Sequence, residues 1–412
     1  MIRIRLTIMS FLQFFIWGCW LITIGAYWFG NKQWDSQDFG VIFSTMGIAA
    51  LFMPAISGII ADRYLSAQKL YGIYHILAGI GLYFVPSASS PADMFWRILL
   101  TMVFYMPTLS LSNTVSYHLL SSKGEDVVKA FPPIRVWGTV GFIAALWCVS
   151  LTHNETSANQ FYLGAAVSLI LGLYAFTFPD CPPLGKATAK KGWMALLGLD
   201  SFALLKEKQY AIFFLFSMLL GAALQLTNAY GDTFLHGFDG QAEYAHSLAV
   251  KYPAMIMSIS QISETLFILA IPFFMKRFGI KQVMLISMIA WVLRFGLLAY
   301  GNPGPGLWMI VLSCIIYGMA FDFFNVSGSL YIEKSADPSI RSRAQGLFTM
   351  MVNGFGAVLG SLSSGWVISR YFEDAQGLKD WSSIWLAFAG YALAVAIAFL
   401  LLFEEPATQS KS

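Results

Sequence analysis

The sequence predicts an all-α integral membrane protein, and two observations carry that prediction. Hydrophobic residues make up 57% of the 412-residue chain and charged residues only 11%, less than half of the roughly 25% found in soluble domains. Too few charged side chains remain to cover a water-soluble globule of this length. Apolar runs also recur along the whole chain, and a helix needs about 20 mostly apolar residues to cross a bilayer.

Twelve such runs predict twelve transmembrane helices. The first run follows Arg3 and Arg5 and resembles a signal peptide, but it is too long for the apolar region of one and eleven similar runs follow. We therefore expect it to remain in the protein. The predicted spans are 6–29, 41–60, 70–88, 95–118, 134–152, 160–179, 209–230, 253–275, 281–300, 306–332, 342–369 and 383–403.

The longest polar segment, 180–208, divides these spans into six and six. We predict an N-terminal six-helix bundle over 1–179, a cytoplasmic linker over 180–208 and a C-terminal six-helix bundle over 209–412. Within the linker, WMALLGLDSFALL (193–205) is amphipathic, so we expect it to lie along the membrane surface.

The basic residues predict the orientation, because Lys and Arg concentrate on the cytoplasmic side of membrane proteins. With the N-terminus in the cytoplasm, 19 of the 25 Lys and Arg residues fall in cytoplasmic segments and four in outer ones. Arg97 and Arg294 fall near the outer ends of spans, where a long side chain can reach the interface. Both termini are therefore predicted to be cytoplasmic.

Two acidic residues stand near the middle of spans, where an unpaired charge is costly. Asp322 follows Phe321 about ten residues from the cytoplasmic end of its span, or ~15 Å along a helix. Glu264 lies halfway along another span. Lipid does not satisfy such groups, so both are predicted to face a cavity or a partner. A structural ion pair of either one with Arg135 is the main alternative.

Polar and aromatic residues at helical spacing indicate a binding site. Residues three, four or seven positions apart share one face of a helix. Carboxylates and amides bind hydroxyls and the edges of heterocycles, and aromatic rings stack on flat ligands. A small, neutral, flat solute with hydroxyl groups fits this set better than a bare sugar or a lipophilic cation. The sets are Arg135, Thr139 and Phe142; Gln225 and Asn228; Gln261 and Glu264; and Tyr317 and Phe321.

Plainer roles are open to most of these residues. The amides can hydrogen-bond between helices, Thr139 can bond to its own backbone, and phenylalanines in apolar segments usually serve packing. Arg135 begins its span and can act as a cytoplasmic anchor. Only for the two acidic residues, Asp322 and Glu264, is a functional role clearly favoured over a structural one.

The sequence gives no sign of a metal, a cofactor or an enzymatic site. The four cysteines and five histidines lack metal-binding spacing, and His236 and His246, in the predicted outer loop 231–252, receive no role. No HExxH, GxSxG or P-loop pattern occurs. The net charge of +3 gives no nucleic-acid footprint.

The arrangement of two six-span halves joined by a cytoplasmic segment resembles the major facilitator superfamily. Its signature, G-x-x-x-D-R/K-x-G-R-R/K, is matched at its start by Gly58, Asp62 and Arg63, whereas Leu65 and Ser66 depart from it. This architecture implies a central cavity with a midplane site that opens to alternate sides of the membrane.

Longer stretches carry a more specific resemblance over essentially the whole chain, to the nucleoside:proton symporters of that superfamily. They are SFLQFFIWGCWL, GIAALFMPAISGIIAD, YMPTLSLSNTVSY, FPPIRVWGTVGFI, FSMLLGAALQLTN, SISQISETLFILAIPFF, YGMAFDFFNVSGS and AQGLFTMMVNGFG.

The resemblance implies a proton-driven importer of nucleosides in the bacterial inner membrane. Its partners would be nucleoside, protons and membrane lipid, with no nucleic acid and no cofactor, and we expect a monomer. A disaccharide:proton symporter of the same fold is the alternative, and a membrane enzyme or receptor without net transport is a more distant one. Asp322 would couple protons, and the nucleoside would be bound by Arg135, Thr139, Phe142, Gln225, Asn228, Gln261, Glu264, Tyr317 and Phe321.

Overall fold

The described part of the chain is helical, as predicted. The structure, a computed structural model, describes residues 2–183, 199–336 and 340–404. Within these residues the only β structure is an isolated bridge between Glu373 and Lys379. The first part of the predicted amphipathic segment 193–205 lies outside the described residues, and its last part belongs to the 3-10 helix η4 (Leu199–Lys206).

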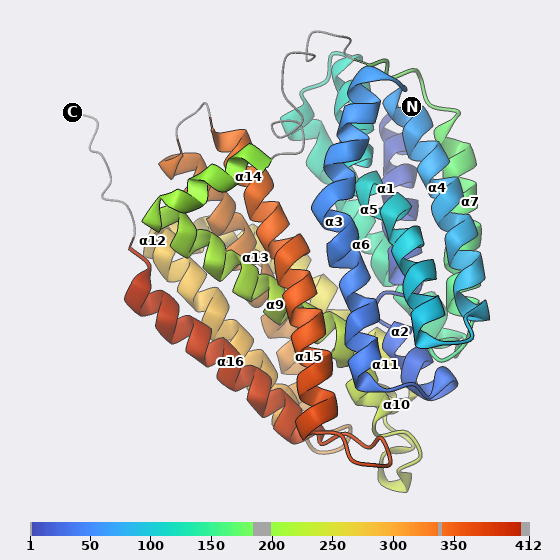
Figure 1. Ribbon diagram of the computed structural model, residues 1–412, viewed down its shortest axis with the longest axis vertical. Coiled ribbons are helices and arrows are strands. Elements are labelled where there is room, and N and C mark those ends of the chain that lie inside the picture. The colour runs from blue at the N-terminus through green and yellow to red at the C-terminus, as the bar shows by residue number, and fades with distance from the viewer. Residues whose placement is uncertain (1, 184–198, 337–339, 405–412) are drawn as a thin grey trace.

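The first half of the chain forms one group of helices, here called the N-terminal helix group (Figure 1). In it α1 packs against α6 and α7, α4 packs against α5 and α7, and α3 packs against α5. Its elements are α1 (Ile2–Gly18), α2 (Ile24–Ala26), the π-helix η1 (Tyr27–Lys32), α3 (Ser36–Arg63), α4 (Ala67–Phe84), η2 (Val85–Ser87), α5 (Pro91–Ser121), α6 (Val127–Leu151) and α7 (Asn159–Ala175).

The second half forms the C-terminal helix group, drawn from green to red in Figure 1. In it α12 packs against α13 and α16, and α9 packs against η6 and α15. Its elements after η4 are α9 (Lys208–His236), η5 (Ala242–Tyr244), α10 (Leu248–Lys251), α11 (Pro253–Met257), α12 (Ile259–Tyr300), α13 (Leu307–Ser335), α14 (Arg341–Thr349), the π-helix η6 (Met350–Gly356), α15 (Ala357–Tyr371) and α16 (Trp381–Leu402).

The element α12 contains a sharp reversal at Gly279. Its 42 residues would extend ~63 Å as one straight helix, about twice the thickness of the hydrocarbon core of a bilayer. Gly279 has φ 79° and ψ 176°, a conformation that a residue with a Cβ atom rarely adopts. Two helices therefore meet at this glycine, between the predicted spans 253–275 and 281–300.

Many of the helices are suited to a membrane. Among the described residues, nine helical segments are long and apolar enough to cross a bilayer by length and composition, the segment Pro253–Tyr300 counting as one of them. The apolar helix α7 has 17 residues and falls below that length, as does α1, also 17 residues long. These lengths and compositions are those of a multi-pass membrane protein.

The two helix groups meet closely along α3 and α15. Gly40 of α3 faces Gly365 of α15, and a Cβ atom on Gly40 would lie 2.4 Å from the carbonyl oxygen of Ser361. Only glycine therefore permits this approach of the two backbones. Further contacts between the groups stack the ring of His153 on that of Tyr252, with centroids 5.6 Å apart.

The contacts between the groups gather toward one end of the molecule. Lys379 Nζ lies 3.9 Å from the ring centroid of Phe29, and α2 contacts α9. In Figure 1, α2, α10 and α11 lie at the end opposite the N-terminus and the C-terminus. Among the described residues, the contacts between the groups are therefore concentrated at this end and extend along α3 to η6, where Gly47 faces Gly354.

Candidate functional site

Asp322 lies inside the protein rather than on its outer surface. It sits midway along α13 and is only 5% exposed. Its Oδ2 atom is buried without a hydrogen-bond partner among the described residues. Asp322 is thus buried within the protein, and its predicted role at a cavity remains a prediction.

Glu264 brings the two helix groups into electrostatic contact. It is half-buried on α12. It interacts electrostatically with Asp322 of α13 in its own group and with Arg135 of α6 in the other group. The two acidic residues singled out from the sequence are thus neighbours, and they lie where the helix groups face one another.

Arg135 does not form the ion pair that was the structural alternative. The ion pairs within 4.0 Å in the described part of the chain include none between Arg135 and Glu264 or Asp322. Its guanidinium carbon lies instead 4.0 Å from the ring centroid of Phe14, a cation–π contact. Its hydrogen-bonding groups are thus not committed to either carboxylate.

A small cavity lies between the helix groups. Asn228, Gln261 and Tyr317 line it from the C-terminal group, and Ile22 lines it from the N-terminal group. Three of the predicted binding residues, from α9, α12 and α13, therefore share one space. Their amide and phenol groups can hydrogen-bond to a polar ligand there.

The aromatic residues Tyr317 and Phe321 form a stacked pair beside this cavity. Their ring centroids are 5.9 Å apart and their planes are inclined by 10°. Phe321 lines a second small cavity, together with Trp291 and Asn325. Each cavity is thus lined by one ring of the pair.

Arg294 is a residue whose place was predicted wrongly. The sequence suggested a side chain reaching the outer interface, but Arg294 is only 1% exposed. It donates hydrogen bonds to Thr227 Oγ1 (3.3 Å) and to the carbonyl oxygen of Ser313 (2.7 Å). Neighbouring helices supply acceptors that lipid lacks, so burial of the guanidinium is favoured over extension to the interface.

Arg294 also belongs to the site. Its guanidinium carbon lies 4.7 Å from the ring centroid of Tyr317, and it lines the same cavity as Gln261. The sequence carried a signal for this position, because an arginine within a span usually faces the protein interior. The expectation failed because the residue lies near one end of its predicted span.

Six of the ten predicted site residues do not line either cavity: Arg135, Glu264 and Asp322, described above, and Thr139, Phe142 and Gln225. Gln225 is half-buried on α9, and Thr139 is half-buried on α6. Phe142 is buried, and its backbone carbonyl lies 2.5 Å from the place of a Cβ atom on Gly18, so this turn of α6 packs tightly on α1. Since α6 also contacts α12, these residues lie near the site without forming the walls of the two cavities.

Comparison with known proteins agrees with this geometry. The family model described as "Nucleoside H+ symporter" matches residues 1–408. The nucleoside permease NupG of Escherichia coli (strain K12) is 52% identical over 404 residues, which cover 98% of this chain and 96% of the permease. The xanthosine permease of the same organism is 50% identical over 404 residues, with the same coverage of each chain.

Solved structures show the same fold. A crystal structure of the nucleoside transporter NupG superposes with a TM-score of 0.91 at 53% identity, covering 98% of this chain and 99% of that one. A POT family transporter at 13% identity gives a TM-score of 0.75, covers 97% of this chain and 95% of that one, and supports the fold alone. The resemblance inferred from the sequence is confirmed, and the chain belongs to the nucleoside:H+ symporter family.

Proposed function

We propose that this protein imports nucleosides by symport with protons, through a site between the two helix groups that opens to alternate sides of the membrane. The observation that carries the proposal is the burial of Asp322 beside Glu264, next to a cavity to which both groups contribute. Polar and ionisable groups at this depth are costly unless they serve a ligand or an ion path.

The architecture we propose has twelve spans in two six-helix bundles, bounded as predicted at 1–179, 180–208 and 209–412. The two helix groups support this division. Composition identifies nine spanning segments among the described residues because α12 holds two spans joined at Gly279, while α1 and α7 are 17 residues long. Counting α12 as two spans and adding these two helices gives twelve.

The proposed nucleoside site retains the nine residues inferred from the sequence. Tyr317 and Phe321 would stack on the base, while Gln261 and Glu264 would bind ribose hydroxyls or the polar edge of the base. Arg294 would position the ring of Tyr317 from behind. The nine residues are Arg135, Thr139, Phe142, Gln225, Asn228, Gln261, Glu264, Tyr317 and Phe321.

Asp322 is the proposed proton carrier. When the site opens outward, water reaches Asp322 and a proton neutralises it. A neutral side chain no longer opposes closure around it, because burying a charge costs far more than burying a neutral carboxyl group. The loaded carrier then opens inward and the proton leaves to the cytoplasm. A membrane potential adds ~2.3 kcal/mol per charge per 100 mV to this drive.

The structure supports an inward-facing state in this scheme. The contacts between the groups gather at the end away from both termini, and the distribution of Lys and Arg favours cytoplasmic termini. The closed end is then the outer end. The protein would be a monomer in the bacterial inner membrane, surrounded by lipid.

Uptake of labelled uridine into proteoliposomes with an acidic outside tests this function. We expect accumulation above the outside concentration, collapse on addition of a protonophore, and loss of accumulation in Asp322→Asn with uridine binding retained. Unlabelled nucleosides should compete and unlabelled disaccharides should not. Uphill accumulation that persists in Asp322→Asn would contradict the role assigned to this residue.

A further inference from the structure

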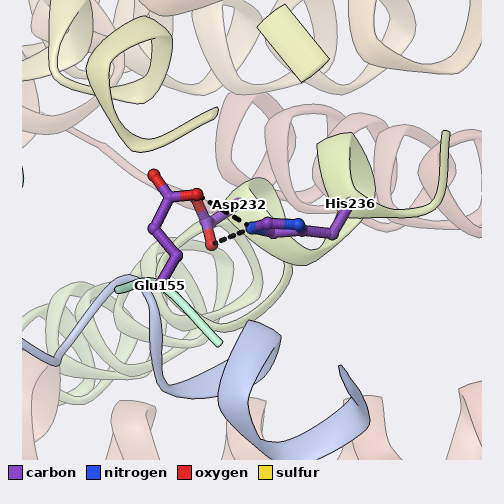
Figure 2. A group of neighbouring side chains, drawn as sticks. All are labelled: Glu155, Asp232 and His236. Carbon is purple, nitrogen blue, oxygen red and sulfur yellow. Dashed lines mark ion pairs between the residues drawn. The ribbon is translucent and has the colours of Figure 1, made fainter. Parts of the chain in front are cut away.

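A second group of titratable residues lies at the outer end, away from the proposed nucleoside site. Glu155 belongs to the connection between α6 and α7, whereas Asp232 and His236 lie in the last turns of α9. One ligand atom from each lies within 4.8 Å of the others, and their side chains converge in Figure 2. The sequence placed His236 in a loop without a role; α9 instead extends to it and aligns it with Asp232, four residues earlier.

The inner contacts of this cluster bring three electron-pair donors together. His236 Nε2 lies 3.2 Å from Glu155 Oε2 and 3.6 Å from Asp232 Oδ2 (Figure 2). Asp232 is fully buried, and neither of its carboxylate oxygens has a hydrogen-bond partner in the part of the chain described. A buried carboxyl group in this condition is stabilised by a cation close to it or by a proton of its own.

The outer contacts hold these donors in place. His236 Nδ1 lies 2.8 Å from Asp239 Oδ2, and since a carboxylate only accepts, Nδ1 carries the hydrogen. Nε2 is then the ring nitrogen that faces the two inner carboxylates. Glu155 Oε1 accepts a hydrogen bond from the backbone N–H of Ala254 (3.1 Å). A histidine ligand whose other nitrogen donates to a carboxylate is the usual arrangement in zinc sites.

We propose that Glu155, Asp232 and His236 bind a Zn²⁺ ion. Donors placed 2.0–2.2 Å from a tetrahedral zinc lie about 3.4 Å from one another, close to the separations of 3.2 Å and 3.6 Å found here. Ca²⁺ and Mg²⁺ prefer sites made of oxygen alone, whereas imidazole with carboxylates suits zinc. Three protein ligands leave a fourth position for water.

The zinc site joins the two helix groups. Glu155 comes from the N-terminal group, and Asp232, His236 and Ala254 come from the C-terminal group. An ion that binds only when these parts are together stabilises that state over the one in which they separate. External Zn²⁺ therefore holds the outer end closed and slows import. The effect on import rests on the proposed function; the binding of zinc does not.

Zinc binding to the full-length protein, purified without a histidine tag, tests the site. The protein is titrated with Zn²⁺ in competition with a chromophoric chelator. We expect one equivalent in the wild type and in His246→Gln, a control at an exposed histidine of the same outer region. Binding should be lost in His236→Gln and Asp232→Asn, and be weakened about 10–100-fold in Asp239→Asn, which removes only the supporting carboxylate.

Uridine binding measured without zinc identifies variants that have not folded. If Asp232→Asn does not bind uridine, the test of the zinc site uses Asp239→Asn and Glu155→Gln instead. Zinc-edge X-ray absorption should show one imidazole and oxygen ligands. Wild-type affinity for zinc in His236→Gln, or no zinc binding by the wild type, would overturn the site. A protonated His236 would then be the cation between the carboxylates.

Import is measured separately, with Zn²⁺ outside the proteoliposomes. Saturating zinc should slow uridine uptake by the wild type and by His246→Gln, and leave uptake by Glu155→Gln unchanged. Unchanged wild-type uptake with zinc bound would overturn the gating effect. Absence of uptake even without zinc would instead contradict the proposed transport function, while the binding measurement would stand.

Discussion

At the scale of single residues, the proposed site is made of side chains that lipid would not satisfy. Glu264, Asp322 and Arg294 all lie within helices suited to a membrane. Each faces a cavity, a neighbouring charge or hydrogen-bond acceptors instead. The sequence identified the two acidic residues because a charge in an apolar run is conspicuous. It misplaced Arg294 because the acceptors that hold it lie on other helices.

The proposed ligand contacts predict a loss of affinity when they are removed. Glu264→Gln replaces a charged acceptor, and hydrogen bonds to charged groups contribute about 1.5–3 kcal/mol, so we expect the Kd for uridine to rise about tenfold or more. Phe321→Ala removes a stacking face and should also weaken binding. Isothermal calorimetry on the purified protein measures both. Phe273→Ala, on an exposed position of α12, is the matched control, and wild-type affinity in both variants would mean that the site is wrongly located.

Substitution of Arg294 should weaken uridine binding less, because Arg294 would position Tyr317 rather than bind the ligand. Arg294→Lys keeps the charge but loses the planar group that bonds to Thr227 and Ser313 and lies against Tyr317. We expect the Kd for uridine to rise up to about tenfold, in line with the loss of one or two hydrogen bonds. Arg97→Lys, whose arginine pairs with Asp93 near the same predicted outer end, should bind uridine normally. Equal effects of the two substitutions would remove Arg294 from the site.

At the scale of helices, hydrophobic length is what the sequence shows well. The spans predicted at 95–118 and 383–403 correspond to α5 (Pro91–Ser121) and α16 (Trp381–Leu402), because the bilayer sets the length of an apolar run. The interruptions within spans were not predicted. The first span is broken between α1 and α2, and the π-helix η6 lies within the span predicted at 342–369, since such local changes depend on neighbouring helices.

The close packing of α3 on α15 gives a prediction at this scale. Gly40→Val would place side-chain atoms against the carbonyl oxygen of Ser361, so the outer ends of these helices should separate and the inward-facing form should lose population. Thiol labelling of a cysteine introduced in place of the buried Ser36, whose carbonyl oxygen lies against Gly365, should increase in the variant. Gly390→Val on α16, where no atom lies within 4 Å of an added Cβ, should leave labelling unchanged. Equal labelling in both proteins would contradict the proposed closure.

At the scale of the whole molecule, the sequence predicted membrane insertion and a division into two halves, whereas contacts between the halves had to come from the structure. The cavity lined by Ile22 and Gln261 and the cluster of Glu155 with His236 each combine residues far apart in the chain. Periodicity within one helix cannot indicate which helix lies opposite. For the same reason, the binding roles of all nine residues and the proton-coupling role of Asp322 remain predictions.

The most direct test of the central claim measures protons that a nucleoside gradient moves. Proteoliposomes without an imposed pH gradient, clamped at zero membrane potential and loaded with a pH-sensitive dye, receive uridine outside. We predict that the lumen acidifies as uridine enters the wild-type vesicles, and that Asp322→Asn binds uridine without moving protons. Uridine entry into wild-type vesicles with no change of internal pH would contradict the account.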